Sequence, residues 1–200
     1  MHPQFSSEGQ NLFYRKATET VWLQPWGPNA IRVRATVLPD FISLPGALLD
    51  QPEQPGAKTE IGNDRASLSN GKIRAEISND GRIRFTHTST GKIFLEELPY
   101  RFYRPPSRDF HASGGNNFHL EVNFLSRAGE RFYGLGQHQH GLLDQKGCVI
   151  DLLQRNTEVC IPFLLSNQGY GFLWNNPAVG RVELAENATR WVAESTRQMD

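Results

Sequence analysis

Two histidines separated by one residue, His138 and His140, are a candidate metal-binding pair in this 200-residue sequence. Alternate residues of a β-strand point to the same face, so the two imidazoles would lie side by side on an extended segment. A catalytic zinc needs a third protein ligand and a structural zinc needs a fourth. Asp144 and Cys148 follow nearby, but no spacing rule selects them as ligands. We therefore interpret the segment around Gln139 as a polar turn that hydrogen-bonds its own backbone, and we expect no metal and no other cofactor.

Carboxylates are the second group that could do chemistry, because paired carboxyls serve as nucleophile and as general acid and base. Asp144 and Asp151 flank Cys148, and Glu96 and Glu97 are adjacent in the sequence. Neighbours along a strand point to opposite faces, so Glu96 and Glu97 do not form a pair. We interpret all four as solvated charges at strand edges, since most carboxylates of folded proteins are exposed. We predict no catalytic residue in this chain.

Two glycines, Gly134 and Gly136, bracket Leu135 in a pattern that superficially resembles a phosphate-binding loop. Such a loop must open a helix whose N-terminus holds the anion, and the sequence that follows does not begin a helix. Residues 132–136 instead predict a strand that ends in a tight turn, where glycine adopts backbone conformations that other residues avoid.

Aromatic residues recur at alternate positions near the end of the chain: Tyr170, Phe172, Trp174 and, further on, Trp191. Such a row could stack against a sugar, but aromatics on an alternating strand more often belong to the core. We favour the core interpretation.

Alternation of apolar and polar residues dominates the chain, and helical periodicity is nearly absent. Clear alternating runs occupy residues 31–37, 73–77, 118–124 and 159–165. Turns rich in Asn, Asp and Gly separate strands about every 8–12 residues, which is typical of an antiparallel β-sandwich. We predict one all-β domain over residues 1–200. A long irregular loop is predicted at residues 39–64, and a second irregular segment at 105–115.

Charge and composition argue against several partner classes. The chain carries 21 basic and 21 acidic residues, so its net charge gives no reason to expect nucleic acid or an anionic membrane. It has no apolar run approaching ~20 residues and no basic, apolar leader, so we expect a cytoplasmic protein. Cys148 and Cys160 are then expected to be reduced, packing thiols.

Three segments occur in a specific order: YGLGQ at 133–137, LQRNTE at 153–158 and IPFLLSNQGYGFLWNN at 161–176. Their order and spacing resemble the end of the N-terminal, galactose mutarotase-like β-sandwich of glycoside hydrolase family 31, which contains α-glucosidases and α-xylosidases. The resemblance covers most of the chain and is strongest after Glu130. It implies an accessory domain, with a catalytic (β/α)8 barrel expected after residue 200.

The same resemblance implies that both catalytic carboxylates are aspartates of the barrel, so the isolated chain is expected to be inactive. The surface that faces the barrel would be uncovered in this chain, which predicts an exposed apolar patch. Residues 191–200 alternate like a strand that continues, as they do in the family.

The family extends a polar loop at residues 153–158 over the barrel mouth, where an aspartate can hydrogen-bond substrate hydroxyls. This chain has no aspartate there, but Arg155, Asn156 and Thr157 supply donors and acceptors suited to hydroxyls. We assign these three as carbohydrate-binding residues for an α-linked glucoside or xyloside. A solvated loop between strands is the alternative. The form LLQRNTEVCIPF is most similar to members described as α-xylosidase-like.

Two other functions stay open at this point. One is a free-standing, lectin-like β-sandwich with its own carbohydrate site. The other is a mutarotase-like activity, because sugar mutarotases share this topology class, but the sequence offers no His/Glu constellation for it.

Overall fold

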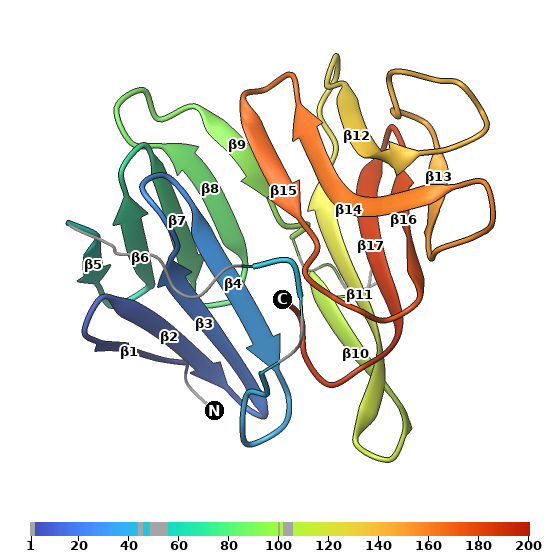
Figure 1. Cartoon of the computed structure of the whole chain (residues 1–200). Helices are drawn as coiled ribbons and strands as arrows, with labels where there is room; N and C mark the ends of the chain where they lie inside the picture. The colour runs from blue at the N-terminus through green and yellow to red at the C-terminus, as the bar shows by residue number, and fades with distance from the viewer. Residues whose placement is uncertain (1–2, 44–45, 49–55, 100, 102–105) are drawn as a thin grey trace. The chain divides into compact units, whose positions relative to one another are not determined.

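The structure, a computed structural model, describes residues 3–43, 46–48, 56–99, 101 and 106–200. Within these ranges the regular secondary structure consists of antiparallel β-strands (Figure 1), which confirms the predicted all-β class. None of the described residues form a helix long and apolar enough to cross a membrane. The chain divides into two compact units, Met1–Glu97 with Arg197–Asp200, and Leu98–Thr196. We call them the first and the second unit.

The first unit contains a four-stranded and a five-stranded sheet, each with its strands in sequence order. The four-stranded sheet consists of β1 (Gln4–Glu8), β2 (Asn11–Lys16), β3 (Glu19–Pro25) and β4 (Ile31–Thr36). The five-stranded sheet consists of β5 (Lys58–Ile61), β6 (Arg65–Asn70), β7 (Ile73–Ser78), β8 (Ile83–His87) and β9 (Ile93–Glu96). Strands β2 and β3 contact β6. Both sheets contribute fully buried side chains, such as Leu12 and Leu23 from one and Leu68 and Ile77 from the other.

The last four residues return to the first unit. Met199 and Ala35 exchange backbone hydrogen bonds, with N–O distances of 2.8 and 3.2 Å. The Arg32 guanidinium binds the Asp200 carboxylate, with its Nε 2.8 Å from Oδ1. The predicted strand over residues 191–200 is therefore too long: it ends at Thr196, because the following residues bend and pair with β4 instead.

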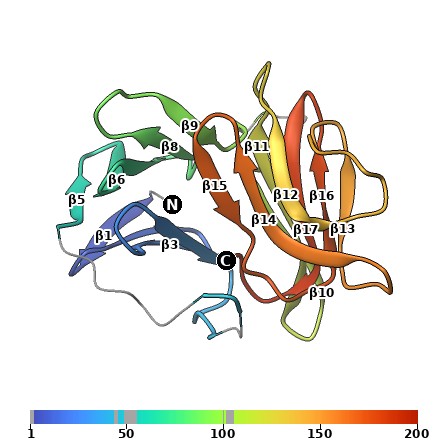
Figure 2. The ribbon, with the colours of Figure 1, turned by 45° about the horizontal axis from the view of Figure 1, so that its top comes forward.

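The second unit is a two-layer sandwich (Figures 1 and 2). One sheet has the order β10 (Arg108–Gly114), β11 (Asn117–Leu125), β17 (Ala188–Thr196), β16 (Gly180–Leu184) and β13 (Val149–Leu152). The other has the order β12 (Phe132–Gln137), β14 (Val159–Ser166) and β15 (Tyr170–Leu173).

Aromatic rings fill the space between these two layers. The Phe172 and Trp191 rings stack with centroids 4.8 Å apart, and the Trp174 and Trp191 rings stack with centroids 5.8 Å apart. Trp174 and Trp191 are 2% and 1% exposed, which confirms the core interpretation.

Two irregular segments predicted from the sequence contain strands. Strand β5 lies in the predicted loop 39–64, of which residues 44–45 and 49–55 fall outside the described ranges. Strand β10 occupies most of the predicted irregular segment 105–115. It is an edge strand with mostly exposed or half-buried side chains, so it lacks the apolar alternation that marks a strand in sequence.

Candidate functional site

A β-bulge shapes the strand beside the polar loop. Gly134, Leu135 and Gly136 all have positive φ angles, of 106°, 66° and 100°. The register of β12 against β14 shifts at this point: Gly134 pairs with Leu164 and Gly136 with Cys160, so Leu135 alone lies opposite residues 161–163, and β14 carries the extra residues of the bulge. A Cβ on Gly136 would lie 1.9 Å from the carbonyl oxygen of Val159, which only glycine avoids. The predicted strand-ending turn is therefore wrong: the strand continues through the bulge to Gln137.

The histidine segment that follows is a turn held by its own backbone, as predicted. The Nε2 atom of His138 lies 2.9 Å from the Leu135 carbonyl oxygen, and the Leu142 amide donates to Nδ1 of His140 at 3.1 Å. The two imidazoles stack with centroids 5.7 Å apart. Over the described part of the chain, no group of three or more His, Cys, Asp or Glu side chains is arranged to hold a metal ion.

The polar loop at residues 153–158 joins β13 to β14. The Gln154 side chain links the start of this loop to the backbone of β14 just after its end. The Gln154 side chain donates from Nε2 to the Cys160 carbonyl at 2.8 Å and accepts from the Cys160 amide at 3.1 Å. Inside this closure the Glu158 amide donates to the Arg155 carbonyl at 3.3 Å. Because both ends are fixed to β14, residues 155–157 form one exposed turn.

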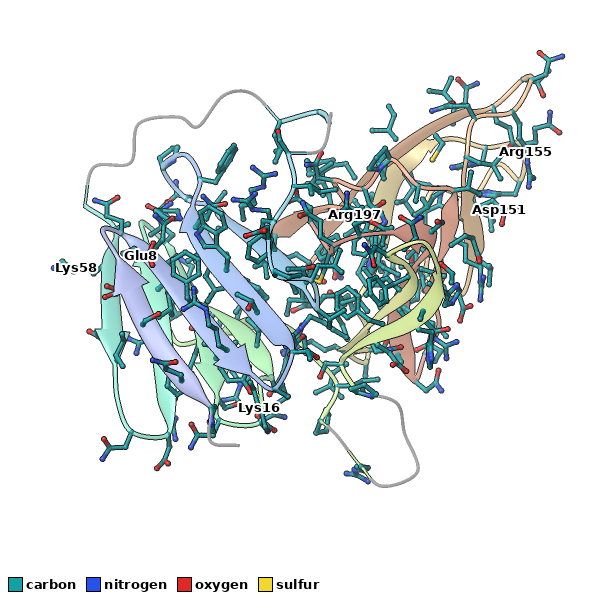
Figure 3. All side chains as sticks on the ribbon, turned by 90° about the horizontal axis from the view of Figure 1, so that it is seen from below. Glu8, Lys16, Lys58, Asp151, Arg155 and Arg197 are labelled. Carbon is teal, nitrogen blue, oxygen red and sulfur yellow. The ribbon has the colours of Figure 1, made fainter. Side chains whose placement is uncertain are left out.

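Each of the three predicted carbohydrate-binding residues is exposed in this turn. The guanidinium of Arg155 pairs with the Asp151 carboxylate at the same end of the second unit (Figure 3). Both side chains are about half exposed, at 51% and 45%, so this ion pair adds little stability. Asn156 stands beside Arg155 in the sequence.

Thr157 joins the polar loop to the histidine turn. Its Oγ1 accepts a hydrogen bond from the Gln139 side-chain amide. Its φ angle is 72°, a left-handed conformation that strains a β-branched residue. Such strain persists only where surrounding contacts enforce it, and it often occurs at ligand-binding sites. The structure thus brings the three residues together, while their binding of carbohydrate stays a prediction.

The carboxylates considered as catalytic candidates have structural partners. Asp144 Oδ1 accepts from the Phe132 and Lys146 amides at 3.1 and 3.0 Å. Glu97 accepts from the backbone amide of Ile83 at 2.8 Å. Glu96 accepts from the Arg84 guanidinium at 2.9 and 2.8 Å. Glu96 and Glu97 thus bind different partners, as expected for neighbours on a strand. They are only 7% and 1% exposed, so the prediction that they are solvated charges is wrong.

Both cysteines, Cys148 and Cys160, are free thiols. Burial raises the pKa of the Cys160 thiol, and the nearby Glu158 carboxylate adds to the rise. A thiol that resists deprotonation is a weak nucleophile. Cys160 is therefore a packing residue, as predicted.

An exposed apolar patch was expected from the sequence without a location, and one such patch lies beside the loop, on the outer face of β14. Four apolar side chains on this face are 38–52% exposed: Val159, Ile161, Phe163 and Leu165. The side chains between them, Cys160 and Leu164, are buried in the sandwich. The signal was present in the sequence, because residues 159–165 contain no charged residue on either face of the strand.

Comparisons with known proteins place these features in a family. The sequence model of the glycosyl hydrolase 31 N-terminal galactose mutarotase-like domain matches residues 20–183. An uncharacterized family 31 glucosidase of Pseudescherichia vulneris is 36% identical over 205 residues, covering 94% of this chain and 38% of that protein. Alpha-xylosidase A of Aspergillus niger is 29% identical over 217 residues, covering 98% of this chain and 29% of that enzyme.

A solved structure agrees with these matches. The crystal structure of a GH31 alpha-xylosidase from a soil metagenome, complexed with xylose, superposes with a TM-score of 0.93 at 35% identity. The match covers 98% of this chain and 31% of that one. The chain therefore spans roughly a third of the length of these relatives, at 38%, 29% and 31%. It belongs to glycoside hydrolase family 31, whose N-terminal galactose mutarotase-like domain it matches.

Proposed function

We propose that this chain is the accessory N-terminal domain of a retaining α-glycoside hydrolase and that its loop at residues 153–158 contributes to the carbohydrate pocket. The observation that carries the proposal is the loop itself. Gln154 ties the loop to β14, and the fixed turn presents Arg155, Asn156 and Thr157 together at the surface. The substrate class we propose is an α-linked xyloside or glucoside, and the relatives named alpha-xylosidases favour the xyloside.

The loop residues suit a positioning role. A guanidinium donates several hydrogen bonds, an asparagine amide both donates and accepts, and a threonine hydroxyl does the same. Sugar hydroxyls need these partners, and a substrate held in the reactive geometry reacts faster. A retaining mechanism also needs two carboxyls roughly 5–5.5 Å apart, which we assign to the part of the parent enzyme outside this chain.

The lectin-like alternative is weaker than the sequence indicated. Its stacking platform would have been the aromatic row, but Trp174 and Trp191 are buried between the two layers. The cytoplasmic location expected from the sequence stays a prediction.

The proposal is tested by assaying the 200-residue chain and the parent enzyme against aryl α-xylosides and aryl α-glucosides. We expect hydrolysis by the parent enzyme and none by the chain alone. Turnover by the chain that disappears in Asp144→Asn or Asp151→Asn would contradict the accessory role.

A further inference from the structure

The polar loop at residues 153–158 is held from outside by a turn earlier in the chain. This turn, residues 138–142, is the histidine turn, and Gln139 lies between its two histidines. The Gln139 side-chain amide donates from Nε2 to Oγ1 of Thr157, although the two residues are 18 positions apart in the sequence. Gln139 therefore reaches one of the three residues assigned to carbohydrate.

The backbone around Gln139 is fixed on both sides. His138 is hydrogen-bonded to the Leu135 carbonyl, and Nδ1 of His140 accepts from the Leu142 amide. The two imidazoles stack with an interplanar angle of 18°. Because both neighbours of Gln139 are anchored, its side-chain amide approaches Thr157 from a defined position.

The hydrogen bond between Gln139 and Thr157 contributes little to the stability of the fold. Both residues are exposed, so water can replace either partner. Thr157 nevertheless has a φ angle of 72°, which strains a β-branched residue. A strained residue that is tethered by an exposed hydrogen bond points to a functional role, because such strain occurs preferentially at ligand-binding sites.

The direction of this hydrogen bond decides what Thr157 can offer a ligand. A threonine hydroxyl has one O–H donor and two acceptor lone pairs. Gln139 donates to Oγ1, so it uses acceptor capacity and leaves the hydroxyl proton to donate elsewhere. The Arg155 guanidinium in the same turn has only N–H donors, of which Nη2 pairs with Asp151. The loop thus offers donors from two of its residues.

We propose that Gln139 is a positioning residue for carbohydrate: it orients the Thr157 hydroxyl so that the proton of this hydroxyl donates to a hydroxyl oxygen of the sugar. This inference rests on the proposed function. Gln139 acts through Thr157 and does not itself contact the sugar. The sugar hydroxyl at this position accepts a hydrogen bond and does not donate one to Thr157.

The test reverses the hydrogen bond by Gln139→Glu in the parent enzyme. An ionised carboxylate of the same size has no donor, so the Thr157 hydroxyl must donate its own proton to it, and the sugar loses that donor. A bond to a non-reacting hydroxyl acts in the ground state and in the transition state alike. We therefore expect KM for an aryl α-xyloside to rise about two- to tenfold while kcat is unchanged.

The matched control is Gln168→Glu, the same chemical change in the turn between β14 and β15. Strand β14 runs from Val159, beside the polar loop, to Ser166, so this turn lies at the other end of the strand. KM and kcat of the control should stay within about twofold of the unmodified enzyme, since surface substitutions have small effects.

The stability of the 200-residue chain separates positioning from a structural role. Gln139→Glu and Gln168→Glu should both unfold at nearly the same urea concentration as the unmodified chain, because both changes lie in surface turns. Unfolding at a clearly lower urea concentration for Gln139→Glu alone, with KM of the parent enzyme unchanged, would show a structural role and overturn the proposal.

A double-mutant cycle shows whether the effect of Gln139 passes through Thr157. Thr157→Val removes the hydroxyl but keeps the size and the β-branch of the side chain, so the backbone is strained in both proteins. In the Thr157→Val enzyme, Gln139→Glu should raise KM no further, because the group that it turns is absent. An equal rise of KM in both backgrounds would overturn the proposal, since the added charge or a direct contact with the sugar would then be the cause.

The same variants separate this inference from the proposed function. If Thr157→Val raises KM but Gln139→Glu does not, the loop binds carbohydrate and Gln139 does not position it. If Thr157→Val is silent while Arg155→Ala lowers kcat/KM, the inference fails and the proposed function stands. If neither these variants nor Asn156→Ala change KM or kcat, the proposed function fails and the inference fails with it.

Discussion

The side-chain amide of Gln154 and the backbone of Cys160 form a closed ring of two hydrogen bonds, at 2.8 and 3.1 Å. Five residues lie between them, including the three assigned to carbohydrate. The position of these residues therefore depends on one side chain and on the strand that carries Cys160.

Gln154→Ala should loosen this loop without unfolding the sandwich. Two net hydrogen bonds are lost, so we expect a decrease in the free energy of unfolding of about 1–2 kcal/mol. The backbone amide of Cys160 should also exchange its hydrogen faster. Asn156→Ala, an exposed substitution in the same turn, is the control and should change neither quantity. Unaltered protection of the Cys160 amide in Gln154→Ala would mean that the ring does not hold the loop.

The left-handed backbone of Thr157 gives a second prediction. Thr157→Gly and Thr157→Val both remove the hydrogen bond with Gln139, but only glycine relieves the steric strain. We expect the glycine variant to be more stable than the valine variant by about 1 kcal/mol, because the greater chain entropy of unfolded glycine offsets part of the relief. Urea denaturation of the two proteins measures the difference. A valine variant as stable as the glycine variant would show that this backbone carries no strain.

Three hydrogen-bonded side chains at the turn end of the β14–β15 hairpin predict that the free energy of unfolding depends on pH. The Tyr170 hydroxyl donates to Glu130 Oε1 at 2.8 Å, and the Ser166 hydroxyl donates to the same oxygen at 2.6 Å. Burial of the phenol raises the pKa of Tyr170 well above its ordinary value, and the Glu130 charge adds to the rise.

The sign of the pH effect follows from this raised pKa. Above a pH of about 10 the phenol loses its proton in the unfolded chain while the folded chain retains it. The unfolded state then binds fewer protons, so the stability contributed by Tyr170 is full below pH about 10 and falls as the pH rises further. Tyr170→Phe should lack this decline, although it costs about 1.5–3 kcal/mol at neutral pH through the lost hydrogen bond to a charged group. Parallel stability curves for both proteins from about pH 8 to about pH 11 would contradict the assignment.

The strands with clear alternation were predictable from the sequence. The predicted runs 118–124 and 159–165 differ from β11 and β14 by at most one residue at each end. Edge strand β10 was not predictable in this way, because its side chains are mostly exposed or half-buried. The bulge between β12 and β14 was missed because a turn and a bulge both place glycines such as Gly134 and Gly136 at positive φ.

The position of the polar loop could be predicted from the sequence, but not the contacts that hold it. The bond from Gln154 to Cys160 depends on how this loop folds back on itself, and the bond from Gln139 to Thr157 depends on how two loops meet in space. Periodicity likewise separates the two faces of β14 without showing which one enters the core, since both are apolar. Only the buried positions of Cys160 and Leu164 decide this.

The substitution His138→Ala tests whether this histidine stabilises the fold or contacts the substrate directly. The imidazole side chain is 7% exposed and is bonded to the Leu135 carbonyl. Its removal should lower the stability of the second unit by about 1–3 kcal/mol, because a buried partner is left unsatisfied. In the parent enzyme kcat/KM at a temperature well below unfolding should then change little. A large loss of kcat/KM with unchanged stability would place His138 in contact with the substrate.

The most direct measurement is kcat/KM of the parent enzyme for an aryl α-xyloside after Arg155→Ala, Asn156→Ala and Thr157→Ala. A lost hydrogen bond costs about 0.5–1.5 kcal/mol for a neutral pair and more for a charged one. Arg155→Ala should therefore lower kcat/KM from several-fold to tens-fold while the fold stays intact. The same substitution in the 200-residue chain should not alter sugar binding, which we expect to be millimolar or weaker. Unchanged kcat/KM for all three variants would contradict the account and reduce the loop to a solvated connection between β13 and β14.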